Sequence, residues 1–138
     1  MVQEAGSPPG WVLRNQPFNW GQRTYIMGIL NITPDSFSDG GQFYQPASAL
    51  AQARRLVAAG ADILDIGGQS TRPQAIEISV DEELGRVIPV IETVRQQSNI
   101  PISIDTTKAA VASAAIAAGA DVVNDVSGGL FDPAMLLT

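Results

Sequence analysis

The sequence of 138 residues contains no cysteine and no histidine. Without cysteine the chain can form no disulfide and no thiolate metal site, and without histidine it lacks the commonest metal ligand and general base. A metal ion would therefore have to be bound by oxygen atoms, which favours Mg²⁺ over Zn²⁺.

Charged residues are also sparse, and basic ones in particular. Only 16% of the residues are charged, and the eight Lys and Arg are outnumbered by fourteen Asp and Glu, which gives a net charge of −6. Because a nucleic-acid-binding surface needs clustered Lys and Arg, nucleic acid is excluded as a main partner. The hydrophobic content of 45% is typical of a globular protein, and the length fits one domain.

Long hydrophobic segments are missing as well. Residues 1–11 carry an acid and several Gly and Pro where a signal peptide would have a basic start and an apolar stretch. The most apolar helical stretch, residues 109–120, is too short and too alanine-rich to span a bilayer. We therefore expect a cytosolic chain with no membrane partner.

The chain repeats part of itself. Residues 58–68 (AAGADILDIGG) align with residues 117–129 (AAGADVVNDVSGG), and between them residues 100–105 form another apolar run that ends in a carboxylate. Each unit consists of a helix, a Gly, a short strand and a polar strand end. This βα repetition predicts parallel strands joined by crossover helices.

Helical periodicity predicts three helices. The first ends at Gly60, where a left-handed cap belongs. The second begins after Ser79, a suitable N-cap, and should be kinked by Pro89 because proline loses one backbone hydrogen bond. The third runs from about residue 107 to 118 and ends at Gly119.

Four strands are expected, at about residues 24–31, 62–66, 101–105 and 121–125. They are short and rich in Ile, Leu and Val, as strands covered on both faces should be. Each ends in a polar residue: Asn31, Asp65, Asp105 and Asn124. In βα barrels the carboxyl ends of the strands form the active face, so we expect these side chains to gather around one ligand.

The predicted fold class is α/β, of the (β/α)₈ TIM-barrel type. A closed barrel of this type needs about 250 residues, so the chain should supply a half barrel of about four parallel strands and three helices. We place the half barrel in residues 23–138 and an N-terminal extension in residues 1–22. The first and last strands would be bare edges, which favour association with another chain.

Two loops at the active face have a composition suited to anions. Residues 31–41 (NITPDSFSDGG) follow the first strand and offer backbone N–H groups and hydroxyls to an anion. Asn31 and Asp35 would be oxygen ligands for a cation bound to that anion. The alternative is a solvated loop whose Asp and Ser satisfy their own backbone.

The second loop, residues 67–73, follows the second strand. Ser70, Thr71 and Arg72 combine hydroxyl donors with a guanidinium that can donate two parallel hydrogen bonds to phosphate oxygens. The alternative is an exposed turn with a solvated arginine. Two anion-suited loops on neighbouring strands favour the functional interpretation of both.

Asp105 and Asn124 should face inward between apolar neighbours, where an unpaired polar group costs about 1–3 kcal/mol. A heterocycle with ring nitrogens and an exocyclic amine would supply donors to Asp105 and both kinds of group to Asn124. The alternative is that each residue holds neighbouring backbone.

Two other polar residues are expected to have no ligand role. Asp65 is interpreted as structural, because its carboxylate can accept hydrogen bonds from the N–H groups of Gly67 and Gly68. Lys108 is interpreted as a solvated lysine in the first turn of the third helix.

Four successive segments resemble dihydropteroate synthase. Residues 27–41 are similar to the first signature of that family and residues 60–73 to the second, and residues 101–106 and 120–125 continue the match in the family's order. The likeness covers about residues 20–132. The resemblance implies a TIM barrel that joins p-aminobenzoate to 6-hydroxymethyl-7,8-dihydropterin diphosphate, which gives 7,8-dihydropteroate and releases pyrophosphate.

Carried over by position, the resemblance also implies roles for single residues. Asn31 would contact Mg²⁺ and the pyrophosphate, and Thr71 and Arg72 would bind the leaving diphosphate, so that these three are the expected catalytic residues. Asp105 and Asn124 would hydrogen-bond the pterin ring. Full-length members of the family would be homodimers.

The chain departs from the family in several places. Gln69 stands where the family usually has Glu, and Gln74 where Gly is common. An Asp and a Lys that complete the pterin pocket, and an Arg-x-His that helps to hold the diphosphate, have no counterpart here, so the isolated chain is expected to be inactive. Two other hypotheses remain: a pterin-binding corrinoid methyltransferase, and a non-catalytic half barrel that assembles through its open edges.

Overall fold

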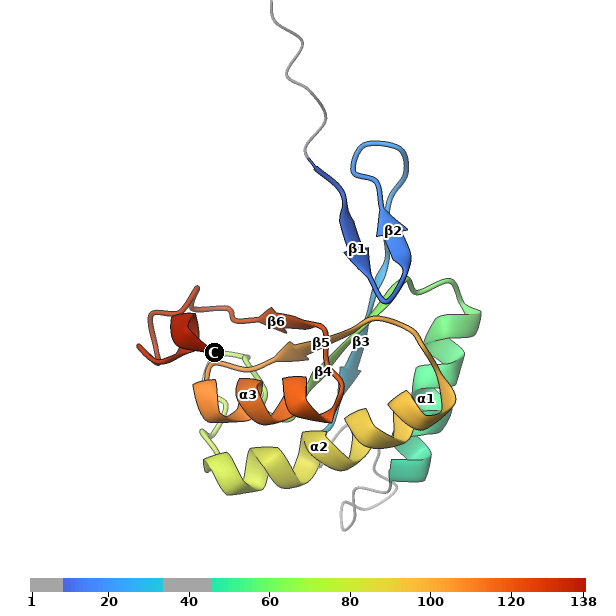
Figure 1. The fold of residues 1–138 in the computed structure, drawn as a ribbon. Helices are drawn as coiled ribbons and strands as arrows, with labels where there is room; N and C mark the ends of the chain where they lie inside the picture. Colours follow the sequence, from blue (N-terminus) through green and yellow to red (C-terminus); the bar gives the residue numbers. More distant parts are fainter. Residues whose placement is uncertain (1–8, 34–45) are drawn as a thin grey trace, which may run out of the picture.

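The computed structural model describes residues 9–33 and 46–138. Its main feature is a four-stranded sheet in the order β3-β4-β5-β6, in which every neighbouring pair is parallel (Figure 1). The strands are β3 (Met27–Asn31), β4 (Ile63–Gly67), β5 (Ile102–Asp105) and β6 (Val122–Asn124). The prediction of four parallel strands in chain order is confirmed, with bounds that differ by at most three residues.

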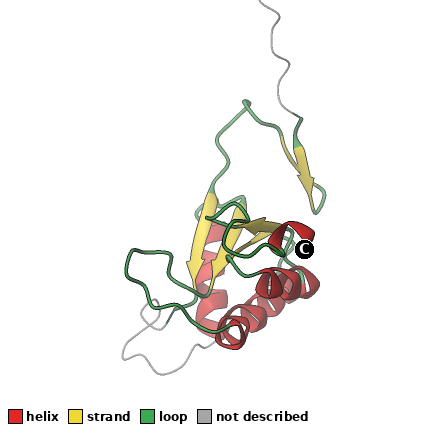
Figure 2. Ribbon diagram, turned by 90° about the vertical axis from the view of Figure 1, so that its left-hand side faces the viewer, coloured by secondary structure: helices red, strands yellow, loops and turns green. Residues whose placement is uncertain are grey.

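Three helices connect the strands and cover one face of the sheet (Figures 1 and 2). They are α1 (Pro46–Ala58), α2 (Val80–Gln97) and α3 (Ala109–Ala118). Each helix joins two parallel neighbours, which is the βα arrangement that the internal repeat predicted. The structure thus agrees with a partial α/β barrel.

The helix ends follow from local sequence. Ser79 caps α2, because its hydroxyl accepts a hydrogen bond from the Glu82 N–H at 3.1 Å. Gly60 and Gly119 have φ values of +104° and +121°, which glycine adopts without steric cost. Pro89 lies inside α2, and the helix continues through it to Gln97.

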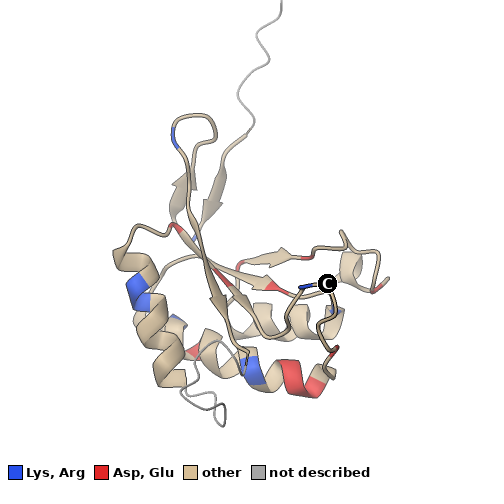
Figure 3. Ribbon diagram, turned by 180° about the vertical axis from the view of Figure 1, so that it is seen from behind, with Lys and Arg blue, Asp and Glu red and all other residues tan. Residues whose placement is uncertain are grey.

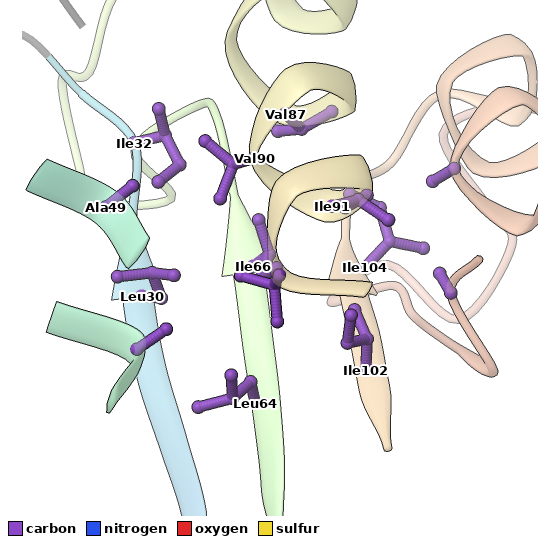
Figure 4. Packing of buried hydrophobic residues seen from close by; sticks show 14 of the residues in the cluster. Leu30, Ile32, Ala49, Leu64, Ile66, Val87, Val90, Ile91, Ile102 and Ile104 are labelled. Carbon is purple, nitrogen blue, oxygen red and sulfur yellow. The ribbon is translucent and has the colours of Figure 1, made fainter. Parts of the chain in front are cut away.

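The hydrophobic core lies between the sheet and the helices (Figure 4). Alternate residues of each strand point into it, and on β4 and β5 these are fully buried: Leu64, Ile66, Ile102 and Ile104. Val87 and Ile91 of α2 pack against them from the other layer. This two-layer core fixes the position of the strands and hence of their carboxyl ends.

An N-terminal hairpin was not predicted. It consists of β1 (Trp11–Leu13) and β2 (Gln16–Phe18), which are antiparallel, and it lies within the segment interpreted as an extension. The two turn residues, Arg14 and Asn15, have φ values of +48° and +64°. A turn of this kind is usually marked by glycine, so the pair gave no recognisable hairpin signal.

The hairpin is attached to the sheet end opposite the carboxyl ends of the strands. Arg14 donates to the Gly119 carbonyl at 3.2 Å and forms an ion pair with Asp121 at 2.7 Å. Asp121 also pairs with Arg95 of α2 at 3.0 Å. No helix in the described part of the chain has the length and apolarity that a bilayer crossing requires.

Candidate functional site

Three of the predicted ligand-binding residues lie in one row across the sheet. Asn31 is in register with Gly67, Gly67 with Asp105, and Asp105 with Asn124. Residues that are level on parallel strands point to the same side, so this row faces away from the core. The expectation that polar strand ends gather at one edge of the sheet is confirmed for these three side chains.

Gly67 is the residue of this row without a side chain, between Asn31 and Asp105. A Cβ atom at this position would lie 3.3 Å from the Cβ and 3.4 Å from the Oδ2 of Asp105. A larger residue would therefore press on the Asp105 carboxyl group. Gly67 is itself buried, and the absence of a side chain allows the Asp105 carboxyl group to lie close against β4.

Asp105 is the titratable group of the row. Burial raises its pKa to about 6, and the nearby carboxylates of Asp65, Glu83 and Asp125 act in the same direction. None of the hydrogen bonds between described residues involves its side chain. The carboxyl group is thus available to a ligand.

Asn124 is held by Asp65. Its Nδ2 donates to the two carboxylate oxygens of Asp65 at 3.3 and 3.2 Å, and only 4% of Asp65 is exposed. The prediction that Asp65 accepts from Gly67 and Gly68 is therefore wrong. Backbone N–H groups of a strand lie in the plane of the sheet, whereas the Asp65 side chain projects from its face toward Asn124.

The loop that follows β4 presents the two predicted diphosphate ligands to solvent. Thr71 and Arg72 are exposed. The backbone turns back here, because the Arg72 N–H donates to the Ser70 hydroxyl at 3.3 Å and the Ala75 N–H to the Arg72 carbonyl at 3.1 Å. Gln74 has a φ of +68°, which explains why glycine suits this position.

Arg72 borders a cavity of about 680 Å³ between this loop and the start of α2. Thr33, from the beginning of the first loop, and Arg86 of α2 line the same cavity. Asn31, Asp105 and Asn124 do not line it. The structure therefore brings together the loops that follow β3 and β4. Arg72 borders the cavity between them and does not belong to the row.

Lys108 is not the solvated lysine that was predicted. Its Nζ forms an ion pair with the Glu83 carboxylate at 2.7 Å and donates to the Gln69 side-chain oxygen at 2.5 Å. The Thr106 hydroxyl donates to the other Glu83 oxygen at 2.7 Å, and only 1% of Glu83 is exposed. The first turn of α2 covers the end of β5, so the lysine reaches an acid instead of water.

These contacts attach the second loop to α2 and β5. Gln69 also accepts a hydrogen bond from the Ile78 N–H at 3.4 Å, at the far end of the loop. Arg86 donates to the Gly68 carbonyl at 2.7 Å. The sequence held a signal for this network, because Glu83 lies on the apolar face of α2 with Val87 and Val90, where a charge needs a buried partner.

Residues 34–45, which include Asp35 and most of the first loop, lie outside the described residues. Asn31 is exposed, and its side chain makes no hydrogen bond within the described part of the chain. No group of three or more Asp or Glu residues in residues 9–33 and 46–138 is arranged to hold a metal ion. A single amide oxygen fits an ion that is bound mainly by phosphate oxygens and water.

The charged positions around the row are marked along the ribbon in Figure 3. Asp65 and Asp105 place two carboxyl groups on the open face, while Arg72 and Arg86 border the neighbouring cavity. An electron-poor ring with hydrogen-bond donors suits the acidic row, and an anion suits the cavity. A ligand with both parts would fit the two regions together.

Comparison with known proteins identifies a family and several of its members that resemble this chain. The sequence model described as pterin binding enzyme matches residues 27–138. A dihydropteroate synthase of Synechocystis is 57% identical over 129 residues, which are 94% of this chain and 45% of the relative. The dihydropteroate synthase of Bacillus subtilis is 49% identical over 126 residues, which are 90% of this chain and 44% of the relative.

Solved structures give the same result. Dihydropteroate synthase of Xanthomonas albilineans with 4-aminobenzoic acid has a TM-score of 0.84 and 48% identity, over 93% of this chain and 46% of that chain. The Burkholderia cenocepacia enzyme complexed with 7,8-dihydropteroate has a TM-score of 0.74 and 46% identity, over 89% and 40%. The chain spans about half the length of the relatives that it matches.

Proposed function

The chain belongs to the family of pterin-binding enzymes, and from this premise we propose that it forms the first half of a dihydropteroate synthase barrel. The reaction joins p-aminobenzoate to 6-hydroxymethyl-7,8-dihydropterin diphosphate, and pyrophosphate leaves. The curated relatives described above are synthases, which favours this function over that of a corrinoid methyltransferase.

The row at the carboxyl ends of the strands is the observation that carries the proposal. Asp105 and Asn124 lie side by side in register on β5 and β6, and Gly67 allows the Asp105 carboxyl group to lie close against β4. The Asp105 carboxyl group accepts hydrogen bonds from ring or exocyclic N–H groups. Asn124 adds one acceptor and one donor, so together they recognise a heterocycle that carries both kinds of group.

The leaving group would bind beside the row. Thr71 and Arg72 supply a hydroxyl and a guanidinium to the diphosphate oxygens, and the cavity next to Arg72 provides the space. We propose Asn31 as one ligand of a Mg²⁺ ion, which would neutralise charge on the diphosphate as it departs. The amine of p-aminobenzoate attacks the carbon that the diphosphate leaves, and no strong base is needed.

The remaining features of the function are also proposals. We expect the protein to act in the cytosol on small molecules, and a complete barrel of this family to form a homodimer. The isolated 138-residue chain should have no synthase activity, because β3 and β6 are edge strands of an open sheet in the described chain. A ligand held on this face would be covered from one side only.

A chimaera tests the proposal. Residues 1–138 would be joined to the part of the Synechocystis relative that lies beyond the matched segment, and formation of dihydropteroate would be measured with the pterin diphosphate, p-aminobenzoate and Mg²⁺. We expect activity that Arg72→Ala or Asp105→Ala lowers about 100-fold or more. A folded chimaera without activity, beside an active parental relative, would contradict the proposal.

A further inference from the structure

Asp65 is a buried carboxylate with one hydrogen-bond partner among the residues that the structure describes. The described residues bring only the Asn124 amide to it, at 3.3 and 3.2 Å, and 4% of Asp65 is exposed. A buried carboxylate with a single neutral donor is costly, because the charge loses its hydration and gains little in return. Asn or Ser at position 65 could form a hydrogen bond between β4 and β6 with a smaller desolvation cost. The presence of a carboxylate therefore requires an explanation.

The carboxylate fixes the orientation of the Asn124 amide. An ionised carboxylate accepts hydrogen bonds and donates none, so it accommodates Nδ2 and repels Oδ1. In the structure it is Nδ2 that faces both carboxylate oxygens of Asp65, at 3.3 and 3.2 Å. The amide therefore has one stable orientation, in which Nδ2 faces Asp65 and Oδ1 is left for a ligand.

We propose that Asp65 is a positioning residue that sets the order of hydrogen-bond donors and acceptors offered to the pterin ring by Asn124. This inference rests on the proposed function and explains how the site would distinguish one heterocyclic ring from another. Asn124 presents Oδ1 and the remaining N–H of Nδ2, next to the Asp105 carboxyl group in the same row. This arrangement favours a 2-amino-4-oxo ring over a 2,4-dioxo ring. In the dioxo ring the amino group at position 2, a hydrogen-bond donor, is replaced by an oxo group, which is an acceptor.

Binding measurements on the 138-residue chain test the selection directly. The probes are 6-hydroxymethylpterin and 6-hydroxymethyllumazine, which differ in the amino or oxo group at position 2, and the ratio of their dissociation constants is measured by titration calorimetry. We expect the parent chain to favour the pterin and Asp65→Asn to lower that preference about tenfold, because an amide at position 65 accepts either orientation of Asn124.

Ser103→Ala is the matched control. Ser103 is in register with Asp65 on the neighbouring strand, is buried and makes no hydrogen bond through its hydroxyl in the described structure. The control should keep the preference of the parent chain. If Asp65→Asn weakens both probes equally and leaves their ratio unchanged, Asp65 is structural only and the proposal is overturned.

A stability cycle separates this inference from the proposed function. Asn124→Asp places two carboxylates together and should destabilise the chain. The double variant Asp65→Asn with Asn124→Asp should recover most of the loss, because the amide and the carboxylate then exchange positions and the hydrogen bond between them forms again. If the parent chain binds neither probe, the proposed function of this face is contradicted. The stability cycle needs no ligand, so it still tests the orientation of the Asn124 amide. Failure of the double variant to recover stability would overturn the orientation.

Discussion

The two faces of the sheet are formed by alternate residues of the same strands, and they differ in composition and in exposure. On the helix-covered face, Leu64 and Ile104 are completely buried among other apolar side chains. On the open face, Asp105 and Asn124 lie in the polar row, and Ile29 is 53% exposed. Adjacent residues such as Ile104 and Asp105 thus lie in opposite environments, and we expect truncation of an apolar side chain to cost far more stability on the helix-covered face than on the open face.

Truncation of an isoleucine on each face should give the largest contrast. Ile104→Ala leaves a cavity in the core and is expected to lower the free energy of unfolding by about 3–4 kcal/mol. Ile29→Ala removes a half-exposed side chain and should cost about 1 kcal/mol or less. Urea unfolding followed by circular dichroism measures both variants. Equal losses would show that the two faces do not differ as described.

The buried ion pair beneath the open face should produce the next largest effect. Lys108→Met leaves the Glu83 carboxylate buried without its cation and should cost about 3 kcal/mol, whereas the double variant with Glu83→Leu should recover part of this loss. Arg55→Met, at an exposed arginine of α1, is the control and should change stability by about 0.5 kcal/mol at most. A loss in the control as large as that of Lys108→Met would refute the buried role.

Asp105 should make the open face sensitive to pH. Its pKa is raised from 3.8 to about 6 in the folded protein, so between pH 4 and 6 the folded state binds more protons than the unfolded state. The contribution of Asp105 to the free energy of unfolding therefore falls as pH rises through this window.

Asp105→Asn removes this titration and should be more stable than the parent at pH 7 by about 1 kcal/mol, after allowance for solvent screening. Below pH 4 this advantage should disappear. Urea unfolding at pH 4, 5, 6 and 7 measures the difference. Parallel pH profiles for parent and variant would rule out the raised pKa.

The smallest expected effect concerns the loop beside the row. Gln74→Gly relieves a left-handed conformation and should raise the free energy of unfolding by about 0.5 kcal/mol, because the gain is partly offset by the greater freedom of the unfolded chain. Ala75→Gly, at the next position and without a positive φ, should lower it instead. Thermal unfolding measures both variants. Changes of the same sign in their free energies of unfolding would contradict the left-handed conformation assigned to Gln74.

The sequence could predict the sheet and the open row because both depend on local, repeated features. Each βα unit has its own helix end, apolar strand and polar strand end, and parallel pairing then brings Asn31, Asp105 and Asn124 to one edge. Neither the strand order nor the row required knowledge of particular side-chain contacts.

The partners of buried polar groups could not be predicted in the same way. Lys108 pairs with Glu83, which is 25 residues away, and Asn124 with Asp65, which is 59 residues away. Such pairs depend on how helices and strands pack, and no local pattern specifies them. The N-terminal hairpin was missed for the opposite reason, because its Arg14–Asn15 turn is local but carries no glycine.

The most direct test of the central claim is a nuclear magnetic resonance titration of the 138-residue chain with 6-hydroxymethylpterin diphosphate and Mg²⁺. The side-chain amides of Asn31 and Asn124 and the Nε–H of Arg72 can be observed individually. If the row and the neighbouring cavity bind the two parts of the ligand as proposed, these signals should show saturable shifts. Shifts confined to other regions, such as the apolar groove between α1 and α2 near Leu50 and Val94, or no shifts at all, would contradict the claim.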